Sequence, residues 1–125
     1  MIVLVTGGRT YSDYVRLGKE LDALAPALIV HGDCPGGADR LADQWAKFKS
    51  IPCLRVPADW AKGKSAGPMR NRRMVNMVAS FEQAGDRWGD NLYSGAMVLA
   101  FPGGAGTAST VQFARDRGLE VRVVT

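Results

Sequence analysis

The sequence has 125 residues, of which 46% are hydrophobic and 22% charged, and its formal net charge is +4. These values are ordinary for a globular chain with one core, and no apolar stretch reaches the roughly 20 residues that a membrane span needs. The apolar run at residues 2–5 is also too short for the hydrophobic part of a signal peptide. We therefore expect one domain over residues 1–125 in the cytoplasm, and the pI of about 9.4 favours anionic partners.

Short apolar runs alternate with helical patterns along the whole chain. The runs predict strands at residues 1–5, 27–31, 52–56, 95–101 and 119–124. Apolar spacing, capping residues and stop signals predict helices at residues 14–24, from 36 to about 48, from 68 to about 83, and at 105–117. Residues 57–67 are expected to form a loop and residues 85–95 a polar surface insertion.

This alternation predicts a three-layer α/β/α, Rossmann-like fold around a parallel sheet of about five strands. We expect the strand order 3-2-1-4-5, because right-handed crossovers limit the possible orders. Strands 1 and 4 then lie side by side while the chain winds away in both directions. Ligands of such sheets bind at this switch point, beyond the carboxyl ends of the strands.

A glycine-rich segment follows the predicted fourth strand. The apolar run ends at Phe101, and the segment that precedes the next helix contains the residues Pro102, Gly103, Gly104, Gly106 and Thr107. Glycines here let the backbone turn tightly and approach a ligand, and the N-terminus of a helix attracts phosphate. We interpret the segment as a phosphate cradle, with a strand–turn–helix corner that binds nothing as the alternative.

Polar residues after the first two strands should reach the same edge of the sheet. They are Thr6, Gly7, Gly8 and Arg9 after the first strand, Gly32 and Asp33 after the second, and Asp39 one turn into the next helix. Arg9 is a candidate partner for phosphate or a solvated loop residue. Asp33 and Asp39 are candidates for binding ribose hydroxyls, although Asp39 also suits a helix N-terminus for electrostatic reasons.

Arg70 and Asn71 lie near the start of the third predicted helix. Anions, not cations, are favoured there, so Arg70 is a candidate phosphate clamp, with a solvated basic helix face as the alternative. Trp60, in the preceding loop, suits stacking on a base or covering the core equally well.

The remaining reactive side chains are read as structural. We predict that His31 is a hydrogen-bonded structural histidine, Cys53 a small core residue and Cys34 an incidental loop thiol. One histidine and two cysteines give no metal cluster and no disulfide framework, so neither a metal nor a cofactor is expected. The chain also lacks the G-x-G-x-x-G and G-x-x-x-x-G-K-[ST] motifs, which argues against an ordinary dehydrogenase and a P-loop NTPase.

Four segments together resemble one known family. They are residues 5–9, 31–40, 58–74 and 101–107, with Arg70-Asn71-x-x-Met74 and Pro102-Gly103-Gly104-x-Gly106-Thr107 as the most specific parts. The chain resembles the YspA-like, cpYpsA-related group of the SLOG superfamily. More distantly, it resembles the Lonely Guy (lysine-decarboxylase-like) phosphoribohydrolases, the molybdenum-cofactor carrier proteins and the DNA-processing protein A fold. The resemblance implies a Rossmann-like fold that binds a nucleotide-like small molecule, and a homodimer or higher homo-oligomer.

This chain lacks the catalytic residue of the Lonely Guy phosphoribohydrolases, the hydrolase branch of the superfamily. There a glutamate follows the threonine of the glycine motif by three residues, a position that Thr110 occupies here, and Asn71 replaces a lysine. Our preferred hypothesis is that the protein binds an NAD- or ADP-ribose-like ligand in order to sense or sequester it. We expect it to come from a bacterium or a phage. The alternatives are an N-glycosidic hydrolase that uses Asp39 or Asp33, and, ranked last, a nucleic-acid-binding protein that uses Arg70, Arg72 and Arg73.

Overall fold

The computed structural model describes residues 1–88 and 95–125. Its elements, in chain order, are β1 (Ile2–Thr6), α1 (Tyr14–Leu24), β2 (Leu28–His31), α2 (Gly37–Lys49), β3 (Cys53–Arg55), the short 3-10 helix η1 (Trp60–Lys62), α3 (Ala66–Trp88), β4 (Ala96–Ala100), α4 (Ala105–Asp116) and β5 (Glu120–Val123).

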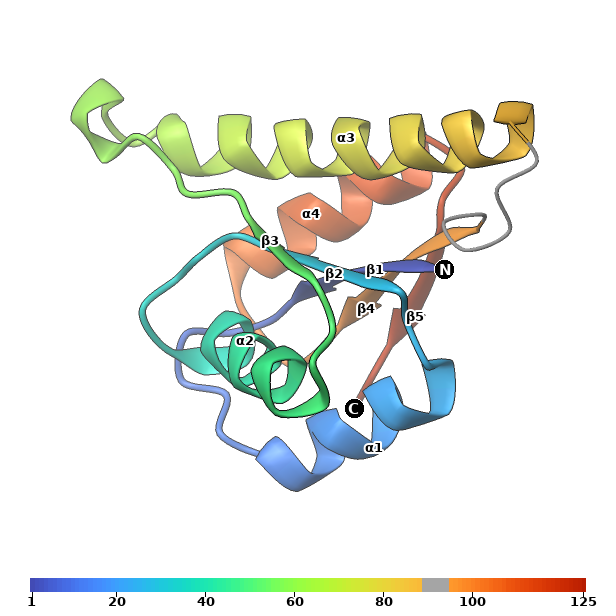
Figure 1. Ribbon diagram of the computed structural model, residues 1–125. Coiled ribbons are helices and arrows are strands. Elements are labelled where there is room, and N and C mark those ends of the chain that lie inside the picture. The colour runs from blue at the N-terminus through green and yellow to red at the C-terminus, as the bar shows by residue number, and fades with distance from the viewer. Residues whose placement is uncertain (89–94) are drawn as a thin grey trace.

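The strands form one parallel sheet in the order β3-β2-β1-β4-β5. Helices α1 and α2 cover one face of the sheet, and α3 and α4 cover the other (Figure 1). The three-layer Rossmann-like fold and the strand order that the sequence predicts are therefore confirmed. The switch point lies between β1 and β4, because α3 carries the chain from the β3 edge back across the sheet.

Burial on both faces explains why the central strands are uninterrupted apolar runs. Val3 and Val5 of β1 pack into the core under α1 and α2, whereas Ile2 and Leu4 pack into the core under α3 and α4. Successive side chains of a strand point to opposite faces, so a sheet covered on both sides buries every position. The whole of β1 and the whole of β4 are accordingly buried.

The helices on the first face follow the predicted pattern with two exceptions. Asp13 caps α1 by accepting the Arg16 backbone N–H at 3.0 Å, and Leu17 and Leu21 of that helix are fully buried. Val15 and Phe48 also fit the helical apolar spacing, but they are 70% and 80% exposed. The apolar stripe that faces the core is therefore narrower than the sequence pattern indicates.

Helix α3 is longer at both ends than the sequence predicts. It begins at Ala66, inside the predicted loop, and that loop also contains η1. It continues to Trp88, so the predicted insertion is wrong for residues 85–88, and residues 89–94 lie outside the described residues. A single glycine, here Gly85, costs a helix only about 1 kcal/mol and does not end it.

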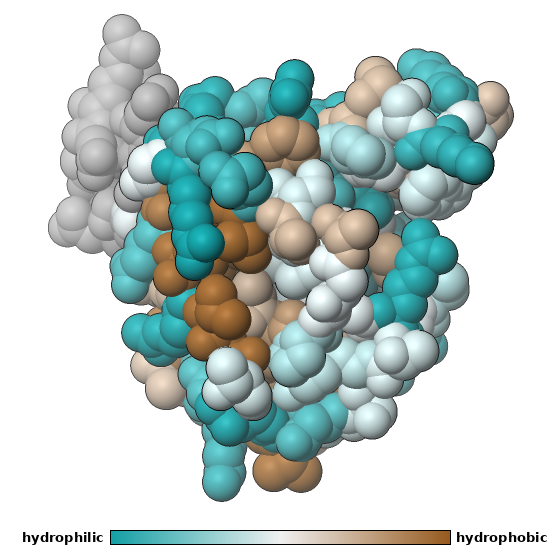
Figure 2. All heavy atoms as spheres, turned by 180° about the vertical axis from the view of Figure 1, so that it is seen from behind, coloured by the Kyte–Doolittle hydropathy of each residue, from teal (hydrophilic) through white to brown (hydrophobic). Residues whose placement is uncertain are grey.

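Figure 2 shows hydrophobic residues gathered on the rear face, on the side of the molecule where β5 lies. β5 is an edge strand, and its Val123 is exposed.

No helix in the described part of the chain is long and apolar enough to cross a membrane.

Candidate functional site

The loops after β1, β2 and β4 meet at one end of the sheet, beside the start of α3 (Figure 1). They enclose a cavity of about 460 Å³. Of the residues singled out in the sequence, those that line it are Thr6, Gly7, Gly8, Arg9, Gly32, Asp39, Arg70, Asn71, Gly104, Gly106 and Thr107. The parallel topology brings these residues together although they span a hundred positions of the chain.

Pro102 and Gly103 shape the cavity without lining it. The Gly8 N–H donates to the Pro102 carbonyl at 2.8 Å, which ties the loop after β1 to the loop after β4. A Cβ atom on Gly103 would lie 2.6 Å from the Gly8 nitrogen. Only a glycine allows the two loops to approach this closely, so Gly103 acts through packing.

The N-terminus of α4 opens into this cavity. Gly104 precedes the helix and offers no side-chain cap, and the first backbone bond runs from the Ala108 N–H to the Gly104 carbonyl at 3.1 Å. The N–H groups of Ala105, Gly106 and Thr107 have no acceptor among the described residues. Unpaired N–H groups and the helix dipole make this end of α4 attractive to an anion.

Arg70 places a positive charge beside this helix end. The residue is only 7% exposed. Its Nε donates to the Asn71 Oδ1 at 2.8 Å, and its Nη1 donates to the carbonyls of Gly32 and Val56. No carboxylate pairs with it among the described residues, and its Nη2 has no acceptor there. The carbonyls fix the guanidinium but do not neutralise it.

Asn71 and Thr110 both support the first turn of α4. The Asn71 Nδ2 donates to the Gly106 carbonyl at 3.3 Å, and the Thr110 hydroxyl donates to the same carbonyl at 3.1 Å. Thr110 is fully buried and does not line the cavity. The position that resembles the hydrolase glutamate therefore carries a structural residue in this chain.

Asp39 is the carboxylate on the cavity wall, in the first turn of α2. It is 7% exposed, and its Oδ2 accepts the Cys34 backbone N–H at 3.2 Å. The Cys34 thiol also hydrogen-bonds with this carboxylate. Burial, and next the Asp39 carboxylate, raise the pKa of the neighbouring Cys34 thiol, so Cys34 presents a neutral thiol to the cavity.

Asp33 does not join Asp39. It lines an adjacent cavity of about 560 Å³, which shares Arg9, Trp60 and Arg70 with the first. Asp33 has a left-handed backbone, with φ at 57°, and its N–H donates to the Nδ1 of His31 at 2.9 Å. The structure thus divides the two predicted acidic residues between two connected cavities.

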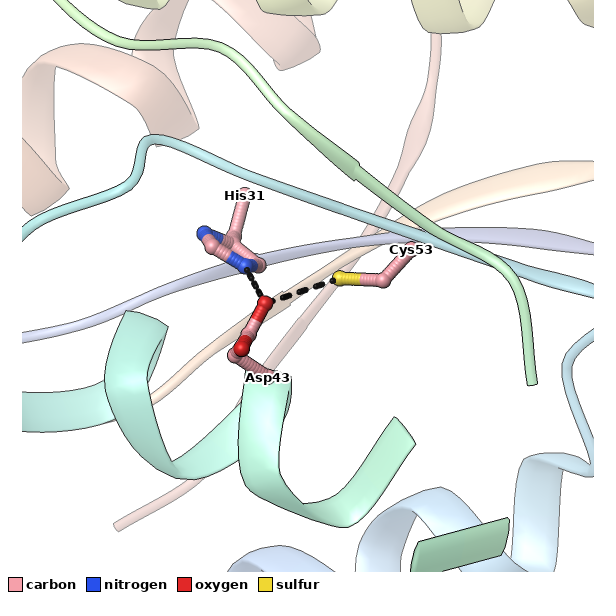
Figure 3. Close-up of side chains that lie close together, drawn as sticks. All are labelled: His31, Asp43 and Cys53. Atoms are coloured by element: carbon pink, nitrogen blue, oxygen red, sulfur yellow. Dashed lines mark hydrogen bonds and ion pairs between the residues drawn. The ribbon is translucent and has the colours of Figure 1, made fainter. Parts of the chain in front are cut away.

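His31 belongs to a hydrogen-bonded group with Asp43 and Cys53, shown in Figure 3. The His31 Nε2 lies 3.0 Å from the Asp43 Oδ1, and the Cys53 Sγ lies 3.5 Å from the same oxygen. Since the His31 Nδ1 accepts the Asp33 N–H, the proton must be on Nε2. Both ring nitrogens are satisfied, which confirms the structural histidine that the sequence predicts.

The same group is a poor metal site, although its potential ligand atoms lie within 4.8 Å of one another. Arg55 already binds both carboxylate oxygens of Asp43, at 2.8 and 3.0 Å, and Lys47 lies 3.3 Å from Oδ2. A metal on His31 Nε2 would move the ring proton to Nδ1, against the Asp33 N–H. Cys53 is only half-buried, and burial and Asp43 raise its pKa to about 12, so it stays a thiol.

Several cavity residues are not among those that the sequence analysis selected as ligand-binding. They are Cys34, Gly67, Pro68, Met74, Ala105 and Ser109, whereas Trp60, which the sequence left between base stacking and core covering, also lines the cavity. Most of them adjoin selected residues on the same loops. Met74 is the exception: it follows Arg70 by one helical turn, a spacing that places both side chains on the same face of α3.

The fold and the site define a Rossmann-like α/β protein with a positively charged pocket at the switch point of its sheet. The family model described as the YspA, cpYpsA-related SLOG family (YAcAr) matches residues 1–63. The chain belongs to this family. The matched range covers the elements from β1 to η1, whereas Arg70 and the loop before α4 lie beyond it. No curated protein matches the chain.

Proposed function

We propose that the cavity at the switch point of the sheet, where the loops after β1 and β4 meet, binds a nucleotide or nucleotide-derived ligand by its phosphate. The observation that carries this proposal is Arg70, a buried arginine that faces the cavity without an anionic partner in the described chain. A buried charge is costly unless it is paired, so a site of this kind favours an anion that neutralises it. The family membership supports a nucleotide-related ligand.

The phosphate would lie on the N-terminus of α4. Phosphate oxygens accept several hydrogen bonds at once, so they suit the three N–H groups of α4 and the Arg70 Nη2, which have no acceptor in the described part of the chain. Arg9 is exposed, has no ion pair in the described chain and lines the same cavity, so it is a second cation for a diphosphate. Asp39 lines the same cavity, and its carboxylate suits a ribose hydroxyl. An NAD- or ADP-ribose-like ligand fits these groups, with sensing or sequestration as its purpose.

A substitution at Gly104 tests this placement. A Cβ atom at this position meets no atom within 4 Å, so a side chain can be added without disturbing the fold. Gly104→Glu would bring a carboxylate to the phosphate position. We expect this variant to keep its thermal unfolding midpoint and to lose at least ten-fold in affinity for ADP-ribose and AMP, measured by calorimetric titration.

Gly104→Gln is the matched control, because it adds the same bulk without the charge. If the phosphate binds here, the glutamine variant retains more affinity than the glutamate variant. The same nucleotide affinity in the wild-type protein and in Gly104→Glu would refute the proposed position of the phosphate.

Asp39 supports a second candidate function, hydrolysis of an N-glycosidic bond. It is a buried carboxylate on the cavity wall, where it is suited to stabilise positive charge developing on a ribose. Chromatography of the nucleotides after the titrations distinguishes the two functions. Free base released by the wild-type protein, but not by Asp39→Asn, would identify a hydrolase, whereas intact nucleotides would leave the binding function.

A further inference from the structure

We propose that Trp60 forms an aromatic platform on which the base of the ligand stacks, at the boundary of the two connected cavities. This inference rests on the proposed function, since it assigns a position to the second half of the same ligand. If the inference holds, the site recognises the planar base of the ligand as well as its phosphate.

The position of the indole is unusual for a side chain of this size. Trp60 is 54% exposed, although indole is among the largest apolar groups that a protein can bury. It begins η1, whose first turn is capped by the Asp59 carboxylate accepting the Ala61 N–H at 3.3 Å. The capped turn presents the ring at the cavity instead of packing it into either core.

The start of α3 supports the ring on one side. A Cβ atom on Gly67 would lie 3.0 Å from the Cη2 of Trp60 and 3.5 Å from its Cζ3. Glycine therefore lets the helix approach the ring closely. This support fixes the indole while leaving much of its surface open, which is the arrangement of a stacking surface and not of a core residue.

Arg9 lies over the Trp60 ring. Its guanidinium carbon lies 5.7 Å from the centroid of the Trp60 ring, near the outer limit of a cation–π contact. Arg9 is exposed and has no ion-pair partner in the described chain, so a planar ring can displace it outward at little cost. The displaced guanidinium would remain at the cavity that holds the phosphate.

The second cavity provides room and polarity for the base. Trp60, Arg9 and Arg70 line both cavities, so a ligand that begins at α4 can extend past them without leaving the protein. Asp33 lies on the wall of the second cavity, and its carboxylate, whose charge acts on Arg55, accepts no hydrogen bond from the described residues. A carboxylate there suits the N–H donors on the edge of a nucleobase.

The experiment compares ligands that differ in the base. The four 5′-nucleoside monophosphates and ribose 5-phosphate are titrated into the wild-type protein and into Trp60→Ala. We expect the preferred nucleotide to bind the wild-type protein about ten-fold more tightly than ribose 5-phosphate, since stacking on an aromatic side chain stabilises a bound base. Trp60→Ala should remove this preference and leave the affinity for ribose 5-phosphate unchanged.

Two further variants separate stacking from a general effect of losing an exposed aromatic residue. Trp60→Phe should retain part of the preference for nucleotides. Phe48→Ala removes an aromatic ring that is 80% exposed and lines neither cavity, so it should behave like the wild-type protein.

The outcomes distinguish the two proposals. A preference for nucleotides that persists in Trp60→Ala would refute the aromatic platform alone, as would equal binding of nucleotides and ribose 5-phosphate to the wild-type protein. If neither kind of compound binds the wild-type protein, the phosphate site is refuted and the platform with it.

Discussion

Asp43 joins three elements through one carboxylate. It lies on α2, accepts two hydrogen bonds from Arg55 of β3, and pairs with His31 at the end of β2. His31 in turn accepts the N–H of Asp33, which lines the second cavity. A single buried acid thus holds the β3 edge of the sheet and the shape of one wall of the site.

This arrangement predicts a specific dependence of stability on pH. The Arg55 guanidinium, followed by His31 and Lys47, holds the pKa of Asp43 well below its usual range. A carboxyl whose pKa is lower in the folded state stabilises the protein above its unfolded pKa of about 4 and loses this contribution as the pH falls further. Asp43→Asn should therefore unfold at lower urea than the wild-type protein at pH 7, and the difference should shrink from about pH 4 to pH 3.

Urea unfolding of both proteins at several pH values measures this effect. Asp116→Asn, an exposed acid at the end of α4, is the control and should follow the wild-type curve. A difference between Asp43→Asn and the wild-type protein that stays constant from pH 7 to pH 3 would contradict the role assigned to the Asp43 charge.

The three arginines at the start of α3 show what sequence alone leaves open. Arg70, Arg72 and Arg73 form one basic cluster in the sequence, but helical geometry turns successive residues by about 100°. Arg70 consequently faces the cavity, whereas the Arg72 guanidinium lies 4.8 Å from the Phe113 ring of α4. The spacing alone does not tell which residue points inward, because that depends on how α3 packs against α4.

At the scale of the elements, the conformation of the loop between β4 and α4 depends on glycine at one position but not at the next. Gly103 and Gly104 are adjacent, yet an added Cβ atom would collide with the Gly8 nitrogen at the first position and meet only open space at the second. We expect Gly103→Ala to destabilise the protein by about 1–3 kcal/mol, as overpacking does, and to weaken nucleotide binding. Gly104→Ala should change the free energy of unfolding by about 0.5 kcal/mol or less.

Urea unfolding of the two alanine variants and calorimetric titration with AMP provide the measurement. Equal stabilities for Gly103→Ala and Gly104→Ala would contradict the close approach of the two loops.

The predicted elements were most accurate where burial determined them. β1 and β4 are buried on both faces, and their apolar runs show this directly in the sequence. The predicted ends of α3 were wrong. Gly67, Pro68 and Gly85 are residues that often begin or end a helix, but α3 includes all three. The contact between Gly67 and Trp60 is a tertiary one, so no local pattern could indicate it.

At the scale of the whole molecule, the sheet separates the hydrophobic core under α1 and α2 from the core under α3 and α4. The candidate site lies at the end of the same sheet. Val3 and Ile2 are neighbours in β1 but belong to different cores, so loss of this strand would open both. That residues 1–125 fold as one domain is still a prediction. The expected homo-oligomer and cytoplasmic location remain predictions.

The topology also explains why so much of the site was predictable. Parallel strands bring their carboxyl ends to one edge, so the residues after β1, β2 and β4 had to meet whatever the side-chain details. What topology does not determine is the burial of Arg70, the separation of Asp33 from Asp39, and the exposure of Trp60. These depend on the side-chain packing of α2, η1 and α3.

Nuclear magnetic resonance of the ¹⁵N-labelled protein during titration with ADP-ribose would test whether the ligand binds where α4 begins. The account predicts large shifts for the amides of Ala105, Gly106 and Thr107 and for the Nε–H of Arg70. Amides of α1, such as Leu21, should stay in place, since α1 lies on the opposite face of the sheet. Saturating ADP-ribose that leaves the α4 amides and Arg70 unmoved, or that shifts residues elsewhere, would contradict the proposed site.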